Sequence, residues 1–188
     1  MLMKKYFSLM ALLLCFTGQA WADKIEASTT DPSNGKPEHL YTMVSGNGYY
    51  ANGYTAPTQT DENKALFAFY SAGISDTYYI YCYTSKKWLS YTKAASYSDG
   101  TKGFLRLTDS KTDGAYFKCN NYSGDYYEIA LYNTTSVATK YLNWFQGVND
   151  SANPLDGTTT LGYWKDNGAN DGGSRWQFAE ADLQTHTY

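Results

Sequence analysis

The sequence is poor in the residues that most catalytic and metal sites require. Its 188 residues include 2 histidines and 3 cysteines, and neither His39 nor His186 lies in a motif that would make it a general base. No Gly-x-Ser-x-Gly, His-Glu-x-x-His or phosphate-binding glycine loop is present. Apart from Cys15 in the N-terminal apolar run, two cysteines remain with no histidine nearby, which does not make a zinc site. We therefore expect no cofactor and no metal ion.

Acidic residues are the one catalytic alternative that the sequence leaves open. Glycoside hydrolysis needs two carboxylates that folding brings together, and Asp156, Asp166, Asp171 and Glu180 lie in one stretch of the chain. Acidic side chains in loops are usually solvated, however. We therefore expect that the protein is not an enzyme.

Charge is also sparse. Charged residues make up 18% of the chain, the formal net charge is −3, and the lysines and arginines are scattered. Nucleic-acid binding needs a clustered basic face. Nucleic acid is therefore not expected as a partner.

Only one long apolar run occurs, and it lies at the N-terminus. A basic start precedes an apolar core at Phe7–Phe16, and Ala20-Trp21-Ala22 has the small-x-small pattern of a cleavage site. The run is shorter than the ~20 residues of a membrane span. Leu14 precedes Cys15 where a lipoprotein signal has a small residue, so cleavage after Ala22 is favoured over lipidation. We expect residues 1–22 to be a secretory signal peptide, with no membrane span, and the protein to be secreted or at the cell surface.

Tyrosine and turn-forming residues are abundant. There are 20 tyrosines and 16 glycines, and no later segment of helical length shows a helical period with both a start and a stop signal. Tyrosine-rich strands joined by Gly, Asn, Asp and Ser turns are typical of an all-β domain. Asp23–Pro37 is polar and contains two prolines, which favours a flexible N-terminal segment. Residues 38–188 are long enough for one domain with its own core.

The remaining sequence divides into three units with the same order of strands. Opening strands are expected at 39–44, 78–83 and 126–131, and second strands at 49–52, 88–91 and 141–144. Third strands are expected at 55–60, 104–107 and 161–164, and closing apolar-x-apolar strands at 67–69, 117–119 and 176–178. Three units of four strands, with edges removed by closure, describe a β-trefoil. A β-sandwich is the alternative.

Three segments of unit three, Tyr141–Trp144, Leu161–Trp164 and Trp176-Gln177-Phe178, resemble the ricin-B-type β-trefoil lectins. That family repeats a strand with an apolar–Asp pair, a strand ending in an aromatic residue, an Asn/Asp/Gly loop and Gln-x-Trp. The similarity is greatest in unit three and extends over about Lys36–Asp182, although Ser174 replaces the glutamine of Gln-x-Trp. The chain is also similar to small secreted bacterial β-trefoil proteins.

The resemblance implies a carbohydrate-binding site in unit three. It maps the aromatic platform of the family onto Trp164 and the polar contacts onto Asn143, Asn170 and Asp171, with Asn143 standing where the family has an aspartate. An apolar sugar face stacks on an aromatic ring, while amides and carboxylates pair with the sugar hydroxyls. Tyr163 is the alternative platform, because neighbouring residues of a strand face opposite sides. A purely structural interpretation also stands: Trp164 packs beneath the loop, and the Asn and Asp residues only form turns.

Cys82 and Cys119 remain in the chain after cleavage. They lie in the opening and closing strands of unit two, which can be neighbours in a trefoil, so the sequence favours a disulfide over two buried thiols. The aromatic residues of the closing strands are expected in the core: Phe67, Phe69, Phe117, Trp176 and Phe178.

The sequence thus predicts a secreted carbohydrate-binding module without catalysis, which binds a glycan or polysaccharide mainly through unit three. The long insertion of that unit, residues 147–159, supports this placement because long loops on rigid scaffolds often carry function. The alternative is a protein-binding trefoil, such as a secreted protease inhibitor or a surface interaction module, in which exposed tyrosines contact a protein partner.

Overall fold

The computed structural model describes residues 24–52, 55–58, 64–93, 102–132, 140–145 and 160–181. The predicted signal peptide, His186, Asp156 and the insertion at 147–159 lie outside these residues. Within them, the secondary structure comprises 12 strands and two 3₁₀ helices, η2 (Lys111–Asp113) and η3 (Gly172–Ser174). The expected all-β class is therefore confirmed. None of the helices in this part of the chain has the length and apolar character needed to cross a membrane.

The strands fall into three successive groups of four, at the places that the sequence repeat predicts. The first group is β1 (Tyr41–Ser45), β2 (Tyr50–Asn52), β3 (Thr55–Thr58) and β4 (Phe67–Ser71). The second group is β5 (Thr77–Cys82), β6 (Lys87–Lys93), β7 (Lys102–Thr108) and β8 (Tyr116–Ser123). The third group is β9 (Tyr126–Tyr132), β10 (Tyr141–Phe145), β11 (Thr160–Trp164) and β12 (Trp176–Glu180).

Strand pairing repeats from group to group. In the first group β1 pairs with β2 and with β4, and β2 pairs with β3. The second and third groups repeat these pairings as β5–β6, β5–β8 and β6–β7, and as β9–β10, β9–β12 and β10–β11. The pairs β4–β5, β8–β9 and β12–β1 join the groups. Strands β1, β4, β5, β8, β9 and β12 therefore form a closed ring of antiparallel pairs, which removes the exposed sheet edges.

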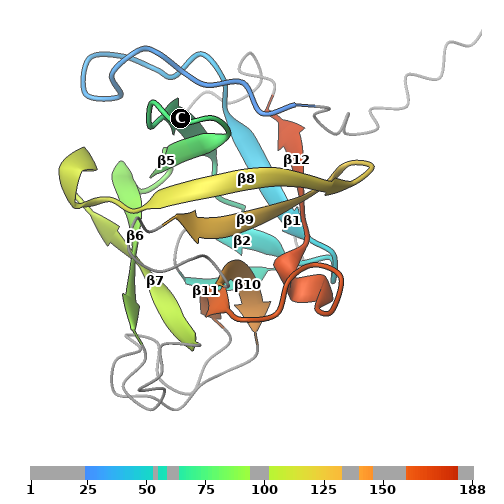
Figure 1. Cartoon of the computed structure of the whole chain (residues 1–188). Helices are drawn as coiled ribbons and strands as arrows, with labels where there is room; N and C mark the ends of the chain where they lie inside the picture. Colours follow the sequence, from blue (N-terminus) through green and yellow to red (C-terminus); the bar gives the residue numbers. More distant parts are fainter. Residues whose placement is uncertain are drawn as a thin grey trace, which may run out of the picture.

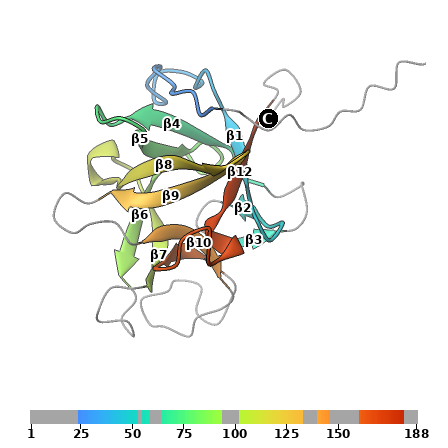
Figure 2. The same ribbon diagram turned by 45° about the vertical axis from the view of Figure 1, so that its right-hand side comes forward.

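Part of the ring lies towards one end of the molecule and most hairpin strands lie towards the other (Figures 1 and 2). In Figure 2, β4, β5 and β8 lie in the upper half, whereas β6, β7 and β10 lie in the lower half. The N-terminal segment, drawn in blue, lies at the upper end in both views. It therefore covers the end of the ring that is remote from the hairpins.

The core lies inside the ring. Each opening strand contributes a tyrosine opposite an aromatic residue of the closing strand of its own group, and these pairs are Tyr41–Phe67, Tyr78–Phe117 and Tyr127–Trp176. The prediction that the closing strands supply core aromatics is confirmed, because all five side chains have 0% exposure: Phe67, Phe69, Phe117, Trp176 and Phe178. Trp176 also donates its indole N–H to the backbone oxygen of Leu142 at 2.8 Å, so its one polar atom is satisfied.

Six side chains form a layer at the end of the ring remote from the hairpins. This mouth layer consists of Tyr41, Phe69, Tyr78, Cys119, Tyr127 and Phe178. Phe69 and Phe178 each contact two of the tyrosines, with ring centroids 5.1 to 6.3 Å apart and steeply inclined ring planes. Cys119 follows Phe117 by two residues, just as Phe69 follows Phe67 and Phe178 follows Trp176 in the other two groups. A cysteine is much smaller than a phenyl ring, so the layer is incomplete at this position.

The N-terminal segment packs against the mouth layer. Ile25 is 4% exposed and belongs to the core cluster, and the backbone N–H of Glu26 donates to the Tyr41 hydroxyl at 2.9 Å. The backbone N–H of Ser28 donates to the backbone oxygen of Phe69 at 2.8 Å. The sequence predicts a flexible segment at 23–37, whereas its described part is anchored, because its one isoleucine gains burial and its backbone finds partners on the ring.

The carboxylate of Glu38 stabilises the turn at Thr29 and Thr30, which follows this anchored part of the chain. Glu38 accepts hydrogen bonds from the backbone N–H groups and the hydroxyls of Thr29 and Thr30, at 2.6 to 3.2 Å. These bonds, the Thr30 hydroxyl foremost, hold the pKa of Glu38 well below its usual range. The ionised form of Glu38 is thus the one that fits this loop.

The expected disulfide is corrected to two buried thiols. Cys82 and Cys119 are both free and buried. Strands β5 and β8 are neighbours, as predicted, but Tyr78 lies opposite Phe117, and Cys119 donates its backbone N–H to the backbone oxygen of Asp76. Cys82 is further along β5 by ~20 Å at a rise of ~3.3 Å per residue. A disulfide cannot join two Cα atoms at that separation.

Candidate functional site

Asn143, one of the predicted sugar contacts, is buried beneath a loop. It lies in β10 opposite Gly162 of β11, and its exposure is 0%. Its Nδ2 donates to Ser174 Oγ at 2.8 Å and to Asp171 Oδ2 at 3.1 Å. Its Oδ1 is buried and finds no hydrogen-bond partner among the described residues. The amide of Asn143 therefore holds residues 165–175, the η3 loop, onto β10.

The η3 loop is fixed at further points. Asp171 caps η3, because its Oδ1 accepts from the backbone N–H of Gly173 at 2.7 Å. The backbone N–H of Gly168 donates to Glu128 Oε1 on β9 at 2.8 Å. The loop also approaches β10 closely: a Cβ on Gly173 would lie 2.5 Å from the backbone oxygen of Trp144, so only glycine fits there. The loop is thus attached to two neighbouring strands.

Trp164 ends β11 at the root of the η3 loop. It pairs with Tyr141, which is two residues from Asn143, so Trp164 and Asn143 face the same side of the β10–β11 hairpin. The indole is half-buried, and its Nε1 donates to Asp166 Oδ2 at 2.8 Å. Tyr163, the alternative platform, is 1% exposed and belongs to the core. Of these two rings, Trp164 is the partly exposed one.

Asn170 and Asp171 lie on the loop itself. Asn170 is exposed, and its Nδ2 donates to Asn167 Oδ1 at 3.2 Å. Asp171 is half-buried, and each of its carboxylate oxygens accepts one internal hydrogen bond. The structure thus brings Asn143 and Asp171 into direct contact, places Trp164 at the root of the same loop, and leaves Asn170 on the loop surface.

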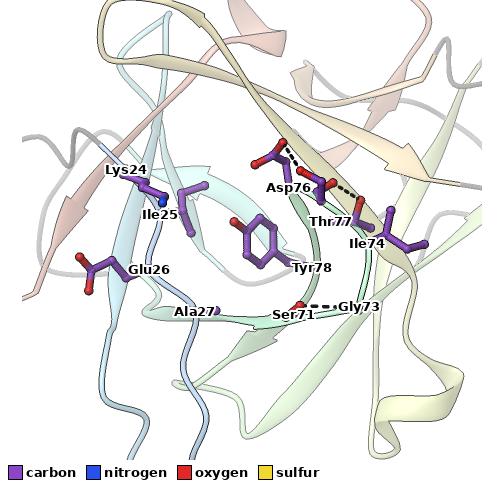
Figure 3. A pocket seen from close by; sticks show the side chains of 11 residues that line it. Lys24, Ile25, Glu26, Ala27, Ser71, Gly73, Ile74, Asp76, Thr77 and Tyr78 are labelled. Atoms are coloured by element: carbon purple, nitrogen blue, oxygen red, sulfur yellow. Dashed lines mark hydrogen bonds between the residues drawn. The ribbon is translucent and has the colours of Figure 1, made fainter.

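A groove that the sequence analysis did not identify lies beside the mouth layer (Figure 3). It has a volume of about 680 Å³ and runs between residues 24–27 and residues 71–78, which include the β4–β5 turn. Figure 3 shows Ile25 and Tyr78 side by side within it, with Asp76 nearby. The groove therefore combines an aromatic and an aliphatic wall with a carboxylate.

A second depression of about 440 Å³ adjoins this groove on the side of β8. It shares Ile25 and Tyr78 with the groove and reaches Cys119 and Tyr127. These residues border the gap in the mouth layer, so a cysteine in place of a phenylalanine in unit two explains the depression. The signal is visible in the sequence, because the closing triplets of the other two units end in phenylalanine.

The Cys119 thiol and two tyrosine hydroxyls at this end of the ring are held in their neutral forms. Burial raises the pKa of the Cys119 thiol far above its ordinary value, and the charge of Asp76 raises it further. Burial likewise raises the pKa of Tyr78, and that of Tyr41 to about 12. A neutral thiol is a poor nucleophile. Among the described residues, no group of three His, Cys, Asp or Glu side chains could hold a metal ion.

No protein-family model and no curated protein matches the chain. Function is therefore inferred from the residues described above and from their geometry.

Proposed function

We propose that the protein is a secreted, non-catalytic β-trefoil that binds carbohydrate through the η3 loop of its third unit. The observation that carries the proposal is the rigid attachment of this loop beside a half-buried tryptophan. Asn143 donates to Asp171 and Ser174, and the Trp164 indole donates to Asp166. Preformed sites with an aromatic surface and a few convergent polar groups suit small polar ligands.

The trefoil architecture is supported by the repeated strand pairing. A trefoil needs three equivalent units of four strands, a closed ring of six strands, and one hairpin from each unit at one end. The three groups use the same pairings, and β12 pairs with β1 to close the ring. The three ring tyrosines then occupy equivalent places, as threefold pseudosymmetry requires.

The chemistry of the η3 loop fits a sugar. Trp164 offers an apolar face, and Lys165 holds its ammonium 5.8 Å from the centroid of that ring. The carboxylate of Asp171 has about four acceptor positions, of which two are used internally, so it can accept from sugar hydroxyls. The exposed amide of Asn170 can donate and accept. Asn143 is a positioning residue in this proposal, since it is buried and acts through Asp171.

A single site of this kind binds weakly. One stacked ring and two or three hydrogen bonds correspond to a Kd of ~0.1–1 mM, or roughly 4–5.5 kcal/mol. Useful avidity then requires clustered glycans or several protein copies. A multivalent glycan surface is therefore the appropriate probe.

The test is a glycan array probed with the chain that begins at Asp23, in wild-type form and as Trp164→Ala. We expect binding by the wild type and loss of it in the variant. Tyr122→Ala is the matched control, because Tyr122 is an exposed aromatic residue (38%) outside the η3 loop, and this variant should bind like the wild type. Glycan binding that survives Trp164→Ala would contradict the proposed site.

Two further results would redirect the proposal. Loss of glycan binding in Tyr78→Leu, with binding retained in Trp164→Ala, would move the sugar site to the groove beside the mouth layer. Absence of glycan binding in the wild type would favour the protein-binding alternative. That alternative is supported by the exposed side chains of Ile74 (43%) and Tyr122 (38%), which are of the kind found in protein interfaces.

A further inference from the structure

A second apolar cluster lies outside the ring, on the outer face of β4 and β5. Its aromatic members are Tyr70, Tyr79, Tyr81, Tyr83 and Trp88. Tyr70 and Tyr79 are directly paired across β4–β5, next to the core-facing Phe69 and Ile80, so they point away from the ring interior. Trp88 comes from β6 and is paired with Tyr81. The carbohydrate proposal uses none of these residues.

The ammonium group of Lys111 lies within about 6 Å of three rings of this outer cluster. The Nζ atom lies 4.8 Å from the ring centroid of Tyr79, and 5.6 Å from those of Tyr70 and Trp88. The ring planes are steeply inclined, by 65° between Tyr70 and Trp88 and by 76° between Tyr79 and Trp88. The three rings thus meet at steep angles on one side of the cation and form a partial aromatic cage. Aromatic cages of this kind recognise alkylated ammonium groups.

The walls of this cage are held in place by other parts of the protein. The Tyr70 hydroxyl donates to the backbone oxygen of Thr30 at 3.0 Å, and the Tyr79 ring meets that of Tyr116 edge to face, with centroids 4.7 Å apart. Tyr70 is 5% exposed and Trp88 is 6% exposed. The cage therefore does not depend on Lys111 for its shape.

Lys111, in contrast, reaches the cage from the surface. It is an exposed residue of the three-residue helix η2 (Lys111–Asp113), which contains no buried residue. Its side chain has four rotatable methylene units, so its ammonium group can leave the rings without a backbone change. The cage thus has a fixed frame and a removable occupant.

The rim of the cage holds two carboxylates, Asp31 and Asp109, and the second of these is paired with Lys87 at 3.0 Å. A depression of about 410 Å³ beside the rings is lined by Tyr70, Trp88 and Lys111 together with Asp31 and Asp109. Hydrogen bonds from Ser33, with a smaller contribution from the Lys111 ammonium, lower the pKa of Asp31. Asp31 is therefore ionised at neutral pH, and its charge attracts a cation to this depression.

We propose that Tyr70, Tyr79 and Trp88 form a binding site for the quaternary ammonium group of a small ligand, with Lys111 as a built-in occupant that the ligand displaces. A trimethylammonium group suits the cage better than a primary ammonium group, because its methyl groups pack against the rings and its hydration is weaker. The depression beside the rings offers room for the rest of the ligand. The site shares no residue with the η3 loop and is independent of carbohydrate binding.

The experiment is a calorimetric titration of the mature chain with choline. The wild type should bind, and Lys111→Gln should bind at least about tenfold more tightly, because a competing occupant lowers the apparent affinity by the fraction of open cages. Lys86→Gln is the matched control: Lys86 also lies over an aromatic ring, that of Tyr83 at 3.1 Å, but outside the cage. This control should bind choline like the wild type. Equal affinities of the wild type and Lys111→Gln would overturn the role of Lys111.

Two further measurements separate the cage from nonspecific binding. The neutral isostere 3,3-dimethylbutanol has the shape of choline without its charge, and we expect no binding of it to Lys111→Gln. Tyr79→Leu in the Lys111→Gln background should lose choline binding while retaining the circular dichroism spectrum of the folded protein. Equal binding of choline and the isostere, or retained binding after Tyr79→Leu, would refute the cage.

The source of the ammonium group is tested with vesicles. Phosphatidylcholine vesicles and free choline present the same trimethylammonium group, so the binding of Lys111→Gln to each of them is measured. We expect binding of free choline and no cosedimentation with vesicles, because the depression beside the cage suits a small molecule. Cosedimentation without binding of free choline would contradict the small-ligand assignment.

Discussion

The side-chain amide of Asn143 donates a hydrogen bond of 3.1 Å to the carboxylate of Asp171, across 28 positions of the chain. This contact joins strand β10 to the η3 loop, and both contain residues that the sequence analysis proposed as sugar contacts. It requires an amide at one end and a carboxylate at the other. An aspartate at position 143 would place two carboxylates face to face, and these would repel each other.

We predict that Asn143→Asp lowers the free energy of unfolding by about 3 kcal/mol. The substitution replaces the donor of two hydrogen bonds with a charged acceptor at a position of 0% exposure. Urea denaturation followed by circular dichroism measures the change. Asn170→Asp is the control, because Asn170 is exposed on the same loop and its substitution should change the free energy by less than about 0.5 kcal/mol. Equal effects of the two substitutions would contradict the buried contact.

A second prediction concerns the incomplete mouth layer. Cys119→Phe should raise the free energy of unfolding by about 1 kcal/mol, because the added ring fills the depression of about 440 Å³ between Tyr78 and Tyr127. The reverse change at an equivalent place, Phe178→Cys, should lower it by roughly 3 kcal/mol, because it opens a cavity in a filled position. Urea denaturation curves of both variants and the wild type measure these changes in the free energy of unfolding. A destabilised Cys119→Phe protein would show that Ile25 and its neighbours already fill the gap.

The two thiols should be unreactive in the folded protein. Cys82 and Cys119 are both buried, and burial raises the pKa of each, so little thiolate is present at neutral pH. We expect neither to react with a maleimide until urea unfolds the chain, after which both should react. Reduction of the unlabelled protein should leave its mass unchanged. A gain of two hydrogens on reduction would reveal the disulfide that the strand register disfavours.

The stability of the protein should fall at acid pH partly through Glu38. The pKa of Glu38 is lowered in the folded state by hydrogen bonds from Thr30 and Thr29, so its contribution is present above the pKa of the unfolded chain and is lost as the pH falls toward the folded value. Glu38→Gln should therefore weaken the dependence of the unfolding free energy on pH below about pH 5. Denaturation series of the wild type and the variant at several pH values test this. Parallel curves would mean that the Thr29–Thr30 turn does not depend on the charge of Glu38.

Much of the fold could be predicted because strands impose a period of two on the sequence. The triplets that end in Phe69, Cys119 and Phe178 each place two side chains inward, and their recurrence identified the closing strands. The same alternation identified Trp176 as a core residue. Features that depend on one strand's own sequence were thus accessible without coordinates.

Features that depend on how two strands are aligned could not be predicted from the sequence. Cys82 and Cys119 lie on neighbouring strands, yet their register separates them. Asn143 faces the same side of the β10–β11 hairpin as Trp164, but the η3 loop folds back over it and accepts its hydrogen bonds. The cage around Lys111 brings together β4, β5, β6 and η2, and no local pattern indicates that these meet.

The all-β class, the order of the strands and the aromatic core can be inferred from the amino-acid sequence, because side-chain alternation and turn chemistry along the chain specify them. The burial of particular polar groups, the separation of Cys82 from Cys119 and the contact of one cation with three rings become visible only in the folded chain. The physical reason is that burial and contact are set by register and by loop paths, which sequence neighbours do not specify.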